Sequence, residues 1–192
     1  DAYMTSYFNA WLDYKDLYVP KRFITAFVPR LNMIPDSVER YFRDYPEGRL
    51  ISIVREPKGW YGSSHRQRPH VYPDVVTGVP FWIESAQAMI RNKETYGDKV
   101  AIISFETLLK NTEGIMRQLA DWIGLTWHPI LTEPTFQRQP IKANTAYSTS
   151  QYGVIATPLE RHKNVSDADA RYIDEQAGDL YQKILSLVMS AE

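Results

Sequence analysis

Residues 49–64, RLISIVREPKGWYGSS, run from an apolar segment through an arginine and a proline turn into a segment that carries two serines. The apolar part is rich in β-branched residues, which predicts a strand over residues 49–55 with Ile51, Ile53 and Val54 buried. Pro57 favours the first turn of a helix, because its fixed φ suits that position and its missing N–H has no partner there. The stretch therefore predicts a strand, a turn and a helix over residues 57–66.

The flanking sequence repeats this alternation. FITAFV, closed by Pro29, predicts a buried strand over residues 22–28, and KVAIISF predicts another over residues 99–105. Apolar residues at helical spacing predict helices over 3–15, 35–45, 81–97, 112–123 with Thr112 as cap, and from Ser166 onward with a capping box to Asp169. Residues 66–80 and 125–164 show no periodicity and are expected to be irregular. Such alternation predicts an α/β fold, a parallel sheet flanked by helices on both faces.

Composition sets limits on function. The 192 residues fit one domain, residues 1–192, and 22 basic against 23 acidic residues give a net charge of −1, which argues against nucleic acid as a partner. The chain has no cysteine, so disulfides and thiolate chemistry are excluded and a reducing, cytoplasmic location is expected. No apolar run is long enough to predict a membrane span.

Arg55 stands at the predicted carboxyl end of a strand, where parallel sheets bind ligands. Its guanidinium and the free amides at the start of the next helix would suit a phosphate, with a serine hydroxyl completing the site. Ser63 lies about 9 Å along that helix from Pro57, at 1.5 Å per residue, so it reaches the same anion only if the helix leans over the strand end. The alternative is that Arg55 pairs with a carboxylate while Ser63 faces solvent.

At these residues the sequence resembles the sulfotransferase family. LISIVREPKGWYGSS is similar to the family's 3′-phosphate-binding strand, loop and helix, with an arginine ending the strand and a serine eight positions later. VAIISFETLLKNTEGIMRQLADWIGLTW resembles the family's next strand, its [FY]E-x-[LM] turn and the helix that follows. The segment from Ala143 to Ile184 is similar, more weakly, to the family's serine-containing loop, basic cluster and closing helix.

The resemblance implies a P-loop NTPase-like architecture that uses 3′-phosphoadenosine 5′-phosphosulfate as sulfuryl donor, without a metal. It implies that Arg55 and Ser63 bind the 3′-phosphate, and that Phe105 contacts adenine; the alternative for Phe105 is a core residue at a strand end. Arg161, His162 and Lys163 fall in the basic segment that closes over the donor in the family. As an alternative, these three residues form a solvated turn.

Two departures from the family pattern stand out. No glycine-rich loop for the 5′-phosphosulfate is present, so the chain resembles the C-terminal two-thirds of the fold and is expected to be N-terminally incomplete. A missing N-terminal segment or another chain, as in a homo-oligomer, would have to supply that loop. Residues 22–30 contain no His or Glu that would act as general base, and the catalytic residues stay unknown.

Other residue types suggest weaker sites. His65 and His70 flank a basic loop and suit a base or a metal, but no third ligand lies at a telling spacing, so no metal site is predicted. The aromatic residues on the predicted helices suit an acceptor pocket or, for Trp82, core packing: Trp60, Tyr61, Phe81 and Trp82.

The sequence thus predicts an enzyme, a sulfotransferase acting on a hydroxyl or amine of a small-molecule, lipid or carbohydrate acceptor. One alternative is a non-catalytic remnant of that fold that keeps a nucleotide or phosphate site or an interaction surface. Another is a phosphotransferase that uses a nucleoside triphosphate and magnesium, against which the missing Walker lysine counts as well.

Overall fold

The computed structural model describes residues 23–136, 139–142 and 150–189. The chain divides into two compact units, Asp1–Gly48 and Arg49–Glu192. The single domain over residues 1–192 stays a prediction. The helix predicted over residues 3–15 lies outside the described residues.

The first unit contains a 3₁₀ turn, η1 (Leu31–Met33), and helix α2 (Pro35–Asp44), which confirms the helix predicted to start with a proline. The strand predicted over residues 22–28 is wrong for its described part. Residues 23–28 have no regular structure, and the side chain of Phe27 is 92% exposed. An extended segment becomes a strand only when a neighbouring strand pairs with its N–H and C=O groups, and none of the described residues does so.

The second unit is built on a small parallel sheet. Strand β1 (Leu50–Val54) pairs with strand β2 (Val100–Ser104) in the register that sets Leu50 opposite Val100 and Val54 opposite Ser104. On its other edge β2 forms a parallel bridge from Ile102 to Val188, with the Met189 N–H donating to the Ile102 carbonyl at 2.8 Å. The predicted parallel pairing is confirmed, and β2 lies at the centre of it.

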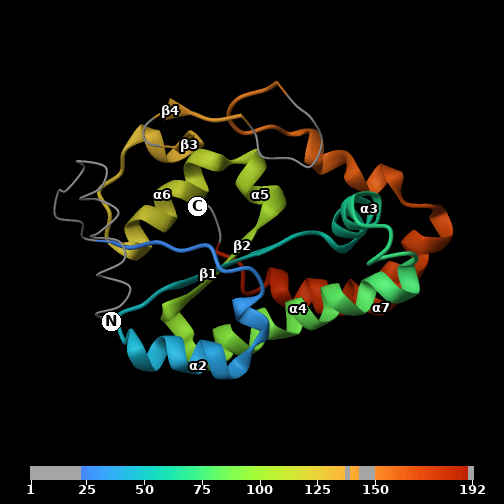
Figure 1. The fold of residues 1–192 in the computed structure, drawn as a ribbon, viewed down its shortest axis with the longest axis horizontal. Coiled ribbons are helices and arrows are strands. Elements are labelled where there is room, and N and C mark those ends of the chain that lie inside the picture. The colour runs from blue at the N-terminus through green and yellow to red at the C-terminus, as the bar shows by residue number, and fades with distance from the viewer. Residues whose placement is uncertain (1–22, 137–138, 143–149, 190–192) are drawn as a thin grey trace. The chain divides into compact units, whose positions relative to one another are not determined.

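Helices cover β2 on both faces, as Figure 1 shows. On one face Ile102 packs against α4 (Val75–Tyr96) and α7 (Asp167–Leu185), in a core that also includes Val54, Trp82, Ala86, Met89, Ile90, Ile173, Ala177 and Ile184. On the other face Ala101 and Ile103 pack against Ile115 and Leu119 of α6 (Thr112–Ile123).

Among the described residues, strand β1 is covered on one face only. Ile51 and Ile53 are 44% and 50% exposed, so their predicted burial is wrong, whereas Val54 is buried as predicted. Ile51 and Ile53 pair with Ala101 and Ile103, the residues that α6 covers. Helix α6 therefore shields this face of β2 and leaves the same face of β1 open within the described residues.

Helix α3 (Pro57–Gln67) follows β1 as predicted. The loop expected over residues 66–80 is shorter, because α4 already begins at Val75. The Asp74 carboxylate accepts a hydrogen bond from the Thr77 N–H at 2.7 Å and caps that helix. Pro80 lies inside α4, where it removes one backbone hydrogen bond among exposed residues.

Two short features after β2 differ from the prediction. The predicted strand end at Phe105 instead begins helix α5 (Phe105–Lys110), which Ser104 caps. At the other end of β2, the 3₁₀ turn η2 (Gly97–Lys99) precedes the strand. Asn111, not Thr112, caps α6, because its side chain accepts from the Gly114 N–H. Gly124 ends α6 with φ of 72°, as its position predicts.

The described part of the region predicted to be irregular, residues 125–164, contains only short elements. These are η3 (Pro129–Thr132), an antiparallel pair of two-residue strands β3 (Thr135–Phe136) and β4 (Gln139–Pro140), and η4 (Thr157–Asn164). Helix α7 follows, and the Ser166 hydroxyl accepts from the Asp169 N–H at 3.1 Å, which confirms the predicted cap. η4 packs on α3, where a Cβ added to Gly62 would collide with the Arg161 carbonyl.

Replacing Gly62 by alanine should therefore force η4 away from α3. We expect Gly62→Ala to lower the free energy of unfolding by about 1–3 kcal/mol, as other overpacked sites do, measured by urea denaturation. Gly178→Ala in α7 is the matched control, because nothing lies within 4 Å of its added Cβ. That variant should be stabilised by roughly 0.5–1 kcal/mol, and a Gly62→Ala protein as stable as the wild type would contradict the close packing.

The Asp74 cap predicts a pH effect. The hydrogen bond from the Thr77 backbone N–H lowers the pKa of Asp74 below its ordinary value of 3.8. Its stabilisation is fully present above the unfolded-state pKa and is lost as the pH falls through the lower folded-state pKa. Unfolding followed from pH 7 into the acid range should show a smaller acid loss in Asp74→Asn, which keeps a neutral cap, and an identical pH dependence would count against this role.

Candidate functional site

The candidate site lies where β1 and β2 end. Arg55 and Glu56 follow β1, and Phe105 and Glu106 follow β2. The two strands run parallel in register, with Val54 opposite Ser104, so these residues meet at one edge of the sheet.

Arg55 is held at three points. Its backbone carbonyl accepts a hydrogen bond of 2.9 Å from the indole Nε1 of Trp82, a buried residue of α4. Its guanidinium lies over the Phe105 ring, 4.8 Å from the centroid, and Nη2 donates to the Pro158 carbonyl of η4 at 2.6 Å. The predicted core packing of Trp82 is confirmed. In this structure the Phe105 ring supports Arg55, and its contact with adenine stays a prediction.

Two glutamates organise the turn after Arg55. The Glu56 carboxylate accepts from the N–H groups of Lys58 at 3.0 Å and Gly59 at 2.6 Å, and so caps α3. Oε1 of Glu106 accepts from the Glu56 N–H at 3.0 Å, and its Oε2 accepts from the Ser104 hydroxyl at 3.2 Å. The expectation that the first amides of α3 are open to an anion is therefore wrong for these two, because a carboxylate of the turn itself binds them.

Sequence reasoning missed both glutamates as organising residues. Glu56 stands directly before Pro57, the first residue of α3, which is where a cap belongs. Glu106 lies in the FETL turn that carries the family resemblance. Burial, followed by the charges of Glu106 and Glu56, raises the pKa of Tyr181.

One face of α3 lies beside Arg55 at its first turn and carries Ser63 one turn further along. Gly59 and Ser63 are four residues apart and therefore lie on the same face. A Cβ at Gly59 would lie 3.4 Å from the Arg55 Nε, so the guanidinium runs along the first turn of that face. Ser63 is 8% exposed and accepts a hydrogen bond of 3.3 Å from Gln67, which contradicts the alternative in which it faces solvent.

The basic segment of η4 is only partly at this site. The Arg161 backbone carbonyl lies against Gly62, in the middle of α3 and next to Ser63. Lys163 is an exposed side chain that pairs with Glu160 at 3.1 Å. The Nδ1 of His162 lies 3.0 Å from the Leu159 carbonyl. The backbone of this segment is thus next to α3, and donor contacts from the Arg161 and Lys163 side chains stay predictions.

His65 lies on another face of α3. Its Nδ1 is 2.7 Å from the Tyr72 carbonyl, and its ring stacks on Tyr61, four residues earlier. Tyr61 is buried in the core with α4, so this pair points away from the face that carries Ser63. His65 is therefore not placed to act beside the predicted phosphate ligands.

The other aromatic side chains form a row between α3 and α4. The Tyr72 ring makes edge contacts with Trp60 at 5.3 Å and with Phe81 at 5.4 Å. These rings pack on one another, and their role in binding an acceptor stays a prediction.

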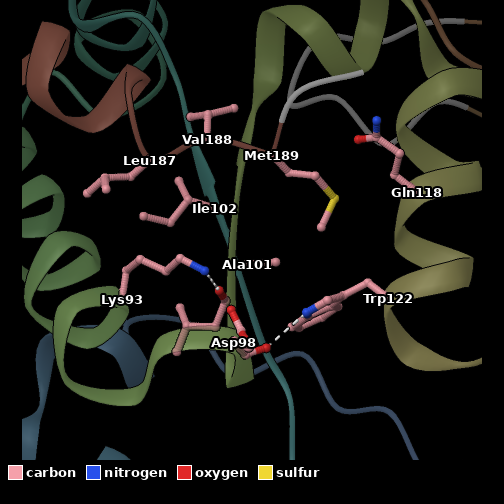
Figure 2. Close-up of a pocket in the computed structure, with 10 residues that line it drawn as sticks. Lys93, Asp98, Ala101, Ile102, Gln118, Trp122, Leu187, Val188 and Met189 are labelled. Carbon is pink, nitrogen blue, oxygen red and sulfur yellow. Dashed lines mark hydrogen bonds between the residues drawn. The ribbon is translucent and has the colours of Figure 1, made fainter. Parts of the chain in front are cut away.

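A cavity of about 430 Å³ lies elsewhere, beside the first half of β2. Figure 2 shows Lys93 on one side of the strand, with Gln118, Trp122 and Met189 on the other. The buried Oε1 of Gln118 has no hydrogen-bond partner among the described residues. The residues that line this cavity belong to the opposite end of β2 from Phe105, so it is separate from the Arg55 site.

Within the described ranges, no cluster of three or more His, Asp or Glu side chains is arranged to hold a metal ion. No helix there combines the length and apolar character needed to cross a bilayer.

Comparison with known proteins gives one informative likeness. No family model and no curated protein matches the chain. A solved sulfotransferase domain from the curacin biosynthetic pathway matches with a TM-score of 0.58 and 18% identity, over 79% of this chain and 60% of that one. At this identity the likeness establishes the fold alone. The chain is thus a mixed α/β protein whose small parallel sheet, flanked by helices, has a sulfotransferase-like fold, and it spans 60% of the neighbour's length.

The hydrogen bond from Trp82 to Arg55 makes a testable contribution to stability. Trp82→Phe removes the donor and part of a buried side chain, and we expect it to lower the free energy of unfolding by about 1–3 kcal/mol in urea denaturation. Trp122→Phe is the control, because Trp122 donates an equally long bond, 2.9 Å, to the Asp98 carbonyl at an exposed position. Equal losses in the two variants would show that the Arg55 carbonyl does not depend on this bond.

Proposed function

We propose that the protein is a sulfotransferase that uses 3′-phosphoadenosine 5′-phosphosulfate as donor. The fold of the neighbouring structure supports the class, and the geometry around α3 supports the donor site. The observation that carries the proposal is that the Arg55 guanidinium lies along the same face of α3 that presents the buried Ser63 hydroxyl.

In this proposal Arg55 and Ser63 bind the 3′-phosphate of the donor. A guanidinium and a hydroxyl supply charged and neutral donors to the same dianion. The phosphate would displace or share the bond from Arg55 Nη2 to the Pro158 carbonyl. Because bonds between ions are stronger than those from an ion to a neutral carbonyl, a phosphate competes well for this guanidinium.

Three further residues are proposed to contact the donor. Phe105 would offer adenine the part of its ring that Arg55 leaves open. Arg161 and Lys163 would turn their cationic side chains toward the phosphates, and Lys163 would give up its exposed pair with Glu160, an interaction of small stability. These motions are confined to η4, the segment that already packs on α3.

In the transfer itself, an acceptor oxygen or nitrogen forms a bond to sulfur while the bond from sulfur to the 5′-phosphate oxygen breaks. The acceptor proton passes to a base, and the electron pair of the broken bond stays on the departing phosphate. We assign no catalytic residue on this chain. The acceptor is proposed to be a small molecule, lipid or carbohydrate, and the reaction is proposed to proceed without a metal in the cytoplasm.

The alternative function is a non-catalytic remnant that binds the nucleotide and transfers nothing. It is favoured by the occupation of the Lys58 and Gly59 amides by Glu56, since these amides are not offered to a phosphate. The two functions differ in turnover and not in binding, so both measurements are needed.

The test is calorimetric titration of 3′-phosphoadenosine 5′-phosphate into the wild type, Arg55→Ala and Ser63→Ala. We expect Arg55→Ala to weaken binding about 10- to 100-fold, as for a hydrogen bond to a charged group, and Ser63→Ala to weaken it about 3- to 10-fold. Arg117→Ala is the control, because Arg117 is an exposed residue of α6 that pairs with Glu113 and should leave the affinity unchanged.

Unchanged affinity in both site variants, or no binding by the wild type, would reject the proposed site. Binding without transfer of sulfate from the labelled donor to a panel of hydroxyl and amine acceptors would favour the remnant.

A further inference from the structure

We propose that Glu106 is a positioning residue that fixes the direction of Arg55, an inference that rests on the proposed donor site. The peptide unit between Arg55 and Glu56 is bonded at both of its polar atoms. Its carbonyl accepts from Trp82 of α4 at 2.9 Å, and its N–H donates to Oε1 of Glu106 on α5 at 3.0 Å.

Holding both atoms of one peptide unit fixes the orientation of its plane. Rotation about ψ of Arg55 or φ of Glu56 would break at least one of the two bonds, because the plane is rigid. The direction in which the Arg55 side chain leaves the backbone is set at this point. Residues of α4 and α5 together thus set the direction in which the Arg55 side chain leaves the backbone.

Glu106 is itself held in place. Its Oε2 accepts from the hydroxyl of Ser104, which in turn accepts from the Thr107 N–H at 3.2 Å and caps α5. The preceding residue, Phe105, lies under the Arg55 guanidinium. Two consecutive residues after β2 therefore support Arg55. Phe105 contacts its guanidinium, and Glu106 accepts from the N–H of the peptide unit that follows Arg55.

These bonds argue against Glu106 as the base of the reaction. Each of its carboxylate oxygens accepts a hydrogen bond from a group of the fold. The residue acts on the nucleotide through Arg55, and the isosteric amide should replace it. A glutamine oxygen accepts from the Glu56 N–H, and its NH₂ donates to the Ser104 oxygen once that hydroxyl turns.

The experiment compares the wild type with Glu106→Ala, Glu106→Gln and, as control, Glu113→Ala, which removes an exposed glutamate of α6. The first measurement is hydrogen exchange of the Glu56 amide without nucleotide. We expect Glu106→Ala to speed this exchange at least about tenfold, while Glu106→Gln and the control stay within about threefold of the wild type.

The second measurement is affinity for 3′-phosphoadenosine 5′-phosphate in the Arg55 and Arg55→Ala backgrounds. In the Arg55 background we expect Glu106→Ala to weaken binding about tenfold and Glu106→Gln to restore it to within about threefold. In the Arg55→Ala background the same change should have almost no further effect, because the group that Glu106 positions is absent.

Equal weakening in both backgrounds, failure of glutamine to restore binding, or unchanged Glu56 exchange in Glu106→Ala would overturn the inference. Absence of nucleotide binding by the wild type would instead reject the proposed function and the role of Glu106 in it. The exchange of the Glu56 amide decides in that case whether Glu106 holds the turn.

Discussion

The arrangement of the site depends on one peptide unit, the one between Arg55 and Glu56. Trp82 donates to its carbonyl, and Glu106 accepts from its N–H. These partners come from helices after each of the two paired strands, so the sheet register, the start of α3 and the direction of Arg55 are coupled at one point. A polar pair of this kind, partly buried, is costly to leave unmatched, which ties the end of β1 to its surroundings.

A second constraint is how closely neighbouring groups approach the backbone of α3 at its two glycines. Gly59 allows the Arg55 guanidinium to lie along the first turn, and Gly62 allows the Arg161 carbonyl of η4 to reach the second. A Cβ at Gly62 would separate η4 from α3, whereas a Cβ at Gly59 would lie at van der Waals distance from the Arg55 guanidinium. The segment GWYGSS therefore combines two positions without side chains and one buried serine on a single face, the face proposed to bind the donor phosphate.

Sequence patterns predicted the local elements of the second unit well. The strand and helix of residues 49–67, the parallel pairing of β1 with β2 and the capped helix after Ser166 follow from β-branched runs, proline at a first turn and a serine cap, all of which act within a few residues. The wrong predictions concern features that depend on residues far away in the chain, namely strand pairing and the burial of a strand face. Residues 23–28 have strand propensity but no paired strand in the described residues, and Ile51 and Ile53 lie beyond the cover of α6.

The residues alone predicted an arginine at a strand end, a serine eight positions later and an α/β alternation, because these features depend on spacing and side-chain type. The folded chain was needed to show that Ser63 is buried on the α3 face beside Arg55, that His65 lies on another face, and that Glu56 binds the Lys58 and Gly59 amides. A helical period sets which residues share a face, whereas the neighbour that each face meets is set by contacts between residues far apart in the chain.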